Sequence, residues 1–267
     1  MSETKLHSLI RYLRSLNNSV IAYSGGVDST LLIKVAKMAG IRFLAVTSCS
    51  ETVPVRDLER SRSITSDLDI DHRTIETNEL RDQNFTDNPP ERCYFCKDIL
   101  FGHLNEIATA EGFEQVLDGS NADDLNDYRP GLKAAKKHGV ISPLIEVGLN
   151  KHDIRELSKY LGLPTWNHPS SPCLSSRFPY GIRITVDGLR MVSEAEDHLR
   201  SLGFRIVRVR TSGASASVEV GKDEISRFAD HDLRHNVIEK FKQLGYNRIQ
   251  FDPEGYRSGK LNRSIGN

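Results

Sequence analysis

One stretch near the amino terminus constrains this chain more than any other. The apolar residues 20–23 are followed by Gly25 and Gly26, and then by a helical pattern that includes Leu31 and Val35. This order predicts a strand, a glycine turn and a helix. Glycines let the backbone approach an anion closely, and the first N–H groups of a helix attract negative charge. An ordinary strand-to-helix turn would explain a glycine pair alone, whereas the whole stretch indicates an anion site.

The loop differs from two familiar phosphate loops. It lacks the lysine of G-x-x-x-x-G-K-S/T and the spacing of G-x-G-x-x-G. Its sequence at 24–29, Ser-Gly-Gly-Val-Asp-Ser, resembles the pyrophosphate (PP) loop of the ATP pyrophosphatase superfamily. That resemblance implies cleavage of ATP between its α and β phosphates, transfer of AMP to a substrate and release of pyrophosphate. It also implies ATP and Mg²⁺ as ligands, with Asp28 as a catalytic residue that helps to place the metal.

We expect the nucleotide to lie on this loop and on the adjacent edge of a sheet. In open α/β sheets, ligands bind beyond the carboxyl ends of the strands, and Ser48 follows the next predicted strand. The expected ATP-binding residues are Ser24, Gly25, Gly26, Asp28, Ser29, Thr30 and Ser48.

Charge and hydropathy argue against two classes of partner. Lys plus Arg and Asp plus Glu both number 36, so the formal net charge is zero. An overall basic footprint for nucleic acid is therefore missing, which weakens, without excluding, a tRNA substrate. No apolar run is long enough to span a membrane, and residues 1–16 lack an apolar signal core. We expect a cytoplasmic homo-oligomer that binds neither nucleic acid nor membrane.

The order of the predicted elements indicates two domains. Strands and helices alternate up to a segment at 166–181 that is rich in Pro and Ser, and this segment carries the boundary. The expected fold class is α/β: a PP-loop ATP pyrophosphatase domain with a parallel sheet at 1–172, followed by a smaller α+β domain at 173–267. The predicted strands are 20–23, 41–46, 72–75, 115–118 and a short 140–144 in the first domain, and 205–210, 217–220 and 248–251 in the second.

The strand at 205–210 carries two arginines on one face. Side chains alternate along a strand, so Arg208 and Arg210 project together, opposite Val207 and Val209. A solvated outer face would have the same pattern. Further cations nearby, such as Arg177, favour a pocket for a phosphorylated small molecule.

Three of the four cysteines could act together. Cys93 and Cys96 form a C-x-x-C pair before a helix expected at 98–110, and Cys173 lies in the Pro-rich segment. Three thiolates could form a Cys₃ zinc site, an Fe–S cluster, or a redox pair with a nucleophile, and His168 could supply a fourth zinc ligand. The fourth cysteine, Cys49, is interpreted as a small buried apolar residue.

Several motifs together resemble the LarE family. They are the phosphate loop and residues 126–134, 173–181, 207–210 and 255–259, so the resemblance spans nearly the whole chain. Members are pyridinium-3,5-biscarboxylic acid mononucleotide sulfurtransferases, which make the thiocarboxylate precursor of the nickel-pincer nucleotide cofactor. The resemblance implies a small-molecule mononucleotide as substrate and makes 173–267 the sulfurtransferase and substrate domain. The substrate-binding residues that it implies are Ser176, Arg177, Arg208, Arg210 and Arg257.

The family contains two sulfur chemistries. In one, a cysteine at the position of Cys173 gives up its own sulfur and becomes dehydroalanine. In the other, three cysteines hold a [4Fe-4S] cluster whose free iron carries sulfide. Because Cys93, Cys96 and Cys173 are all present, we expect the cluster with these three ligands. Cys173 is then also a catalytic residue, and sulfide or a sulfur-donating enzyme is a partner.

Three other functions stay open at this point. A tRNA thiolase can combine a similar loop with three cysteines, but should carry a basic surface. A synthetase of the NAD or GMP type would use ammonia on the adenylate and leave the cysteines unexplained. A non-enzymatic sensor of adenine nucleotides would need neither the cysteines nor the arginine-bearing strand.

Overall fold

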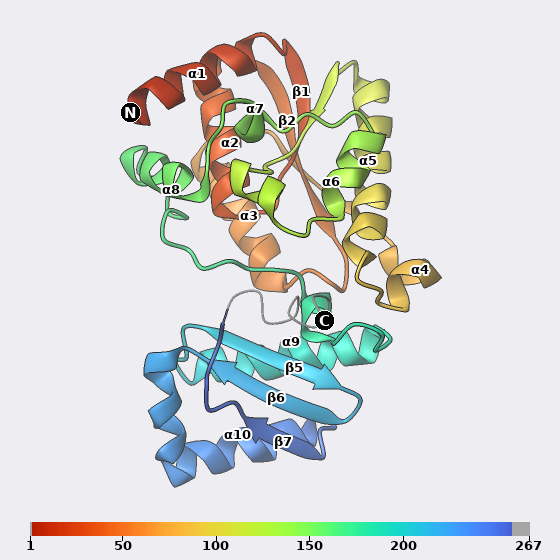
Figure 1. The fold of residues 1–267 in the computed structure, drawn as a ribbon, viewed down its shortest axis with the longest axis vertical. Helices are drawn as coiled ribbons and strands as arrows, with labels where there is room; N and C mark the ends of the chain where they lie inside the picture. Colours follow the sequence, from red (N-terminus) through yellow and green to blue (C-terminus); the bar gives the residue numbers. More distant parts are fainter. Residues whose placement is uncertain (1, 258–267) are drawn as a thin grey trace. The chain divides into compact units, whose positions relative to one another are not determined.

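The protein divides into two compact units in a computed structural model that describes residues 2–257 (Figure 1). Contacts among the described residues group 2–79 with 91–171, and 80–90 with 172–257. The short segment 80–90 therefore leaves the first unit and packs with the second. No helix in the described part of the chain is both long and apolar enough to cross a membrane.

The first unit is built on a parallel sheet. Its strands are β1 (Asn18–Ala22), β2 (Arg42–Cys49), β3 (His72–Glu76) and β4 (Gln115–Leu117). They lie in the order β3-β2-β1-β4, and all neighbours are parallel. The chain thus runs outward from β1 to β3 and then crosses to β4 on the other side of β1. Ligands of open α/β sheets bind at such a reversal of strand order, beyond the carboxyl ends of the strands.

Two hydrophobic clusters account for the apolar sequence of β1. Val20 belongs to a cluster that includes Phe101, whereas the next residue, Ile21, belongs to a cluster that includes Leu31. Burial on both faces of a parallel strand explains its nearly continuous apolar sequence. The helices of this unit are α1 (Ser2–Arg14), α2 (Val27–Ala39), α3 (Val55–Asp67), α5 (Arg92–Glu111), α6 (Gly131–Lys137), α7 (Pro143–Glu146) and α8 (Lys151–Tyr160), with the 3₁₀ turn η2 (Ala122–Asn126). A further 3₁₀ turn, η1 (Glu79–Arg81), begins at the last residue before the segment 80–90.

Two sequence-based expectations for this unit are wrong. The strand expected at 140–144 is reduced to a single parallel bridge between Ile141 and Leu117, because α7 begins at Pro143. Proline favours the first position of a helix, where its missing N–H costs nothing. The helix expected at 98–110 begins at Arg92, so the C-x-x-C pair lies inside α5 and not before it.

The second unit is a small α+β structure, as the sequence predicts. Strands β5 (Val207–Ser212) and β6 (Ser215–Val220) are antiparallel, and β7 (Arg248–Phe251) runs parallel to β6. Val207 and Val209 enter a core with Leu199 and Phe241. The helices are α4 (Gln83–Thr86), α9 (Val186–Ser201) and α10 (His231–Gln243), with the 3₁₀ segments η3 (Leu174–Arg177) and η4 (Lys222–Ala229).

Asn88 fastens the segment 80–90 to this unit. Its side chain is fully buried, and Nδ2 donates to the backbone carbonyls of Pro179 at 2.7 Å and Ile182 at 2.9 Å. Its own carbonyl accepts a hydrogen bond from Gly181 N at 2.9 Å. Asn88 has a φ of 54°, and Asn is one of the few residues other than Gly that adopt this conformation readily. One residue thus satisfies polar backbone groups of an irregular segment that has no sheet partner.

Candidate functional site

The phosphate loop lies between β1 and α2, where the strand order reverses (Figure 1). Gly25 has a φ of 69°, and a Cβ atom there would lie 3.3 Å from Ser61 Cβ on α3. Backbone conformation and the packing of α3 therefore both favour glycine at this position. Gly26 is the N-cap of α2 and provides no side-chain cap, so the first N–H groups of α2 can receive an anion.

Two serine hydroxyls border these N–H groups. Ser24 Oγ and Ser29 Oγ lie 3.2 Å apart, and Gly26 N donates to Ser24 Oγ at 3.4 Å. Ser29 Oγ also donates to the carbonyl of Gly26 at 3.3 Å. All these distances are long for hydrogen bonds, so a phosphate oxygen could replace these contacts at little cost in free energy. The structure thus brings Ser24, Gly26 and Ser29 together as the sequence predicts.

Asp28 forms an ion pair that the sequence analysis missed. Its Oδ1 atom accepts a hydrogen bond from Lys151 Nζ at 2.7 Å, and Lys151 is the first residue of α8. Burial raises the pKa of Asp28, and the Lys151 ammonium opposes that shift. The sequence does contain a signal for this ion pair. A cation in the first turn of a helix interacts unfavourably with the helix dipole, so Lys151 at the start of α8 indicates a compensating anionic partner. The Asp28 carboxylate offers the oxygen ligands that Mg²⁺ prefers.

Thr30 and Ser48 are two other expected ATP ligands. Thr30 is fully buried, and its Oγ1 lies 3.4 Å from the hydroxyl of Tyr23 in the core. Ser48 lies within β2, in register with Ile75 of β3, and not past the end of the strand. Gly119, a glycine with no role assigned from the sequence, packs closely against the start of α2. A Cβ atom at this position would lie 3.0 Å from Ser29 N.

The C-x-x-C pair lies in the first turns of α5. Residues three apart share a helix face, so Cys93 and Cys96 point to the same side. Cys96 Sγ lies 3.9 Å from Oε1 of Glu79, a buried carboxylate that also accepts a hydrogen bond from Ser50 at 2.9 Å. No disulfide joins any of the four cysteines, all of which lie in the described residues.

Cys173 belongs to the second unit, directly before η3. Across residues 2–257, no group of three or more His, Cys, Asp or Glu side chains is arranged to hold a metal ion. Thiolates are the usual ligands of Fe–S clusters, and Cys93 and Cys96 place two thiols on one face of α5. Cys49 is half-buried at the end of β2, which agrees only in part with the expected buried apolar role.

Arg177 is the centre of the candidate site in the second unit. Its Nε donates to Glu196 Oε1 at 2.7 Å and its Nη2 to Oε2 at 3.0 Å, and both side chains are 0% exposed. Its Nη1 donates to the carbonyls of Pro172 at 2.8 Å and Cys173 at 3.2 Å, and to Ser176 Oγ at 2.8 Å. The enclosed guanidinium therefore fixes the backbone that carries Cys173. The described hydrogen bonds of Arg177 are to the protein itself, and its contact with substrate stays a prediction.

Glu196 is a functional residue that sequence reasoning missed. Burial alone would raise its pKa, but Arg177 and Arg200 lower the pKa to about 2. Glu196 Oε1 also accepts a hydrogen bond from Val209 N of β5 at 3.1 Å. A signal was present, because Glu196 interrupts an otherwise apolar stripe of α9 formed by Leu189, Val192 and Leu199.

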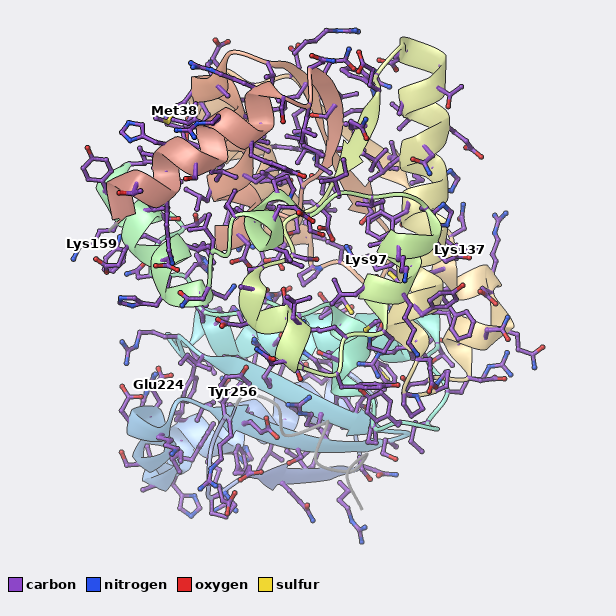
Figure 2. All side chains as sticks on the ribbon, turned by 45° about the horizontal axis from the view of Figure 1, so that its top comes forward. Met38, Lys97, Lys137, Lys159, Glu224 and Tyr256 are labelled. Atoms are coloured by element: carbon purple, nitrogen blue, oxygen red, sulfur yellow. The ribbon has the colours of Figure 1, made fainter. Side chains whose placement is uncertain are left out.

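Arg208 and Arg210 share a face of β5, but that face is not simply solvated. Arg208 is only 5% exposed, and its guanidinium lies 4.9 Å from the ring centroid of Tyr256, a residue that Figure 2 labels. Burial, together with a neighbouring guanidinium, lowers the pKa of Arg208 to about 10. Arg210 Nη1 donates to the carbonyl of Ser176 at 2.6 Å, and Nη2 lies 3.3 Å from Glu219. Arg177, Arg208 and Arg210 thus form one cationic cluster around the Cys173–Ser176 backbone.

Arg257 takes a different position from the other expected substrate ligands. Its Nη1 atom pairs with Glu254 at 3.7 Å. The last two residues of this motif, Ser258 and Gly259, lie outside the described residues.

A parallel sheet of this order, with a Ser-Gly-Gly-x-Asp-Ser loop at the end of β1, defines a PP-loop ATP pyrophosphatase fold. An NMN synthetase from Francisella tularensis has a similar fold, with a TM-score of 0.53 over 64% of this chain and 76% of that chain, at 19% identity. No protein-family model matches the chain.

Two curated relatives extend over the whole chain. The uncharacterized protein slr1717 of Synechocystis sp. is 44% identical over 266 residues, which are 99% of each chain. The pyridinium-3,5-bisthiocarboxylic acid mononucleotide synthase of Lactiplantibacillus plantarum is 36% identical over 264 residues, 98% of this chain and 95% of that protein. The chain therefore belongs to the family of that synthase, the LarE family, as the sequence motifs predict. Membership supports an ATP-using synthetase or transferase.

Proposed function

We propose that this protein is an ATP-dependent sulfurtransferase that converts a carboxylate of pyridinium-3,5-biscarboxylic acid mononucleotide into a thiocarboxylate, for nickel-pincer nucleotide biosynthesis. The observation that carries the proposal is the pair of hydrogen bonds from Arg177 to the Cys173 carbonyl and from Arg210 to the Ser176 carbonyl. One cluster thus combines cations suited to phosphate and carboxylate groups with a segment that carries a thiol. The relatedness to a synthase of the bisthiocarboxylic acid mononucleotide supports the choice of substrate.

The first step activates the carboxylate. A substrate carboxylate oxygen attacks the α-phosphorus of ATP. The bond between the α-phosphorus and the oxygen that bridges to the β-phosphorus breaks, and pyrophosphate leaves. Ser24, Gly26 and Ser29 would bind the leaving pyrophosphate through their N–H and hydroxyl groups. Asp28 would hold Mg²⁺, which supplies charge stabilisation on the phosphates when bound. Gly25 and Ser48 complete the proposed ATP-binding region, to which Thr30 belongs through its position near the start of α2, while its side chain packs into the core.

The second step replaces AMP by sulfur. A sulfur nucleophile attacks the carbonyl carbon of the acyl adenylate, a C–S bond forms, and the C–O bond to AMP breaks. Activation is needed because a carboxylate oxygen is a poor leaving group, whereas AMP leaves readily. We propose Ser176, Arg208, Arg210 and Arg257 as ligands of the substrate's phosphate and carboxylates, with Arg177 holding the backbone of Pro172 and Cys173 in place.

The proposed sulfur carrier is a [4Fe-4S] cluster on Cys93, Cys96 and Cys173, which would supply sulfide as the nucleophile. The alternative is a sacrificial Cys173 that donates its own sulfur. The presence of Cys93 and Cys96 on one face of α5 favours the cluster, because a single donor would not need them. We also propose a cytoplasmic homo-oligomer in which 1–172 binds ATP and 173–267 holds substrate, with sulfide or a sulfur-donating enzyme as partner.

The test is a product analysis under anaerobic conditions. The purified protein is incubated with Mg·ATP, the biscarboxylic acid mononucleotide and sulfide, and the products are identified by mass spectrometry. We expect AMP, pyrophosphate and a thiocarboxylate in equal amounts. Formation of ADP and orthophosphate, or thiolation of tRNA in place of the mononucleotide, would contradict the proposal.

A further inference from the structure

A chain of contacts inside the first unit leads from the phosphate loop to the end of that unit. Arg60 Nε of α3 donates a hydrogen bond to the carbonyl of Gly25 at 3.1 Å. Arg60 Nη1 pairs with Asp57 Oδ1 at 3.0 Å, and Asp57 Oδ2 accepts a hydrogen bond from Ser171 Oγ at 2.7 Å. Asp57 is a buried carboxylate, and Arg56 Nε also lies 3.7 Å from its Oδ1, so two guanidinium groups and one hydroxyl compensate its charge. None of these contacts is used in the proposed chemistry.

The hydrogen bond from Arg60 to the Gly25 carbonyl fixes the direction of the Gly26 N–H donor in the loop. In a planar trans peptide, the C=O of one residue and the N–H of the next point in opposite directions. Arg60 holds the Gly25 carbonyl toward α3, so the Gly26 N–H must point the other way, where it donates to Ser24 Oγ. A phosphate bound to the Gly26 N–H would in turn keep the Gly25 carbonyl aimed at Arg60. Glycine at both positions makes this peptide easy to rotate when no anion holds it.

The hydrogen bond from Ser171 to Asp57 restrains the connector between the two units, which is formed by residues 166–171. Residues 166–171 have no helix or strand, and α8 holds their start, because Arg155 donates to the carbonyls of Trp166 at 2.7 Å and His168 at 2.9 Å. The Ser171 hydroxyl holds the end of this segment through its hydrogen bond to Asp57. Cys173 follows two residues later. Asp57 therefore joins the loop, through Arg60, to the segment that leads to the reactive thiol.

We propose that Asp57 is a positioning residue that couples occupancy of the phosphate loop to the order of the connector before Cys173. Phosphate on the Gly26 N–H stabilises the Gly25–Arg60 contact, Arg60 stabilises the orientation of Asp57, and Asp57 then retains Ser171. A ligand can shift a segment only if it interacts differently with the two states, and the orientation of the Gly25–Gly26 peptide supplies that difference. The inference rests on the proposed function insofar as the loop must bind ATP.

The test measures amide hydrogen exchange of residues 166–176 with and without Mg²⁺ and a non-cleavable α,β-methylene analogue of ATP. In the wild-type protein, the saturating analogue should slow exchange in this segment by about fivefold or more. Ser171→Ala removes only the hydroxyl, and should abolish the slowing. Ser171→Thr keeps a hydroxyl and is the matched control, in which the slowing should persist. Asp57→Asn removes the charge that holds Arg60, and should also abolish the slowing of exchange by the analogue.

Calorimetry with the same analogue separates the two proposals. Because Ser171 lies outside the loop, Ser171→Ala should bind the analogue with a dissociation constant within about threefold of wild type. Equal slowing of exchange in Ser171→Ala and wild type, or no slowing in a wild-type protein that binds the analogue, would overturn the coupling. Failure of the wild-type protein to bind the analogue at all would instead contradict the proposed ATP-dependent function, and the coupling with it.

Discussion

The carboxylate of Glu196 and the guanidinium of Arg177 meet in a two-point ion pair, at 2.7 and 3.0 Å, from which solvent is fully excluded. The pair joins α9 to the turn after Cys173, and the same guanidinium holds the carbonyls of Pro172 and Cys173. A buried pair of this kind adds little net stability, but the loss of one partner leaves an uncompensated charge in the interior. Its value here is the fixed geometry of the Cys173 segment.

Glu196→Gln should therefore destabilise the protein strongly. The change leaves Arg177 buried without its counter-ion, and we expect the free energy of unfolding to fall by about 3–5 kcal/mol. The matched control is Glu194→Gln on the same helix, where a largely exposed carboxylate pairs with Arg190 and the change should cost less than about 1 kcal/mol. Urea denaturation monitored by circular dichroism measures both. Similar losses in the two variants would contradict the assigned role of Glu196.

The stability difference between wild type and Glu196→Gln should depend on pH. The pKa of Glu196 is lowered from 4.5 to about 2 in the folded state, so its ionised form contributes stability above its unfolded-state pKa. That contribution is lost as the pH falls through the folded-state pKa. We expect the difference in unfolding free energy to be constant from pH 7 to about 5 and to shrink steadily toward pH 2. A difference that stays constant over the acid range would show that the carboxylate is not held ionised.

Asp28→Asn should abolish ATP cleavage while leaving the fold intact. The change removes the charge without altering the volume much, and its partner Lys151 is partly exposed and can return to water. ATP–pyrophosphate exchange should be lost, whereas the free energy of unfolding should change by less than about 1 kcal/mol. Asp69→Asn, at an exposed carboxylate that pairs with Lys37, is the control and should exchange normally. Retained exchange in Asp28→Asn would remove Asp28 from the catalytic site.

Arg208→Ala and Arg210→Ala should each weaken binding of the mononucleotide without a comparable effect on ATP. A lost charge-assisted hydrogen bond is worth about 2 kcal/mol, which raises the dissociation constant roughly 30-fold. Arg190→Ala, at a largely exposed position of α9, is the control. Because Arg208 is buried, Arg208→Lys is a second variant that keeps the charge and should lose only part of the affinity. Equal weakening of ATP binding would argue that these arginines belong to the nucleotide site.

Replacement of Cys93, Cys96 or Cys173 by Ala should each remove most of the iron and all sulfur transfer, if three thiolates hold one cluster. Cys49→Ala, half-buried at the end of β2, should leave both unchanged. The measurements are iron and sulfide analysis after anaerobic purification, multiple-turnover assays with added sulfide, and mass spectrometry of the intact protein. A single turnover that leaves dehydroalanine at position 173, in protein that never bound iron, would establish Cys173 as a sacrificial donor.

The sequence alone determined the parts of this protein that depend on near neighbours. The glycine loop between β1 and α2, the parallel strands of the first unit and the shared face of Arg208 and Arg210 all follow from periodicity and turn chemistry within a few residues. The start of α5 at Arg92 was missed, because the residues around the C-x-x-C pair give no strong helix signal before the tertiary contacts form. The family followed from motifs that are themselves short and local.

Only the tertiary structure decided the partners of the charged residues. Lys151 reaches Asp28 from 123 positions away, and the Asn88 side chain binds Pro179 from 91 positions away. No local pattern encodes such pairs, since they exist only after the chain has closed around its cores. Burial then decides the chemistry of these residues. On an open strand the Arg208 guanidinium would be solvated, whereas here it is an enclosed cation next to the ring of Tyr256. Desolvation makes each buried charge depend on the partners that folding brings to it.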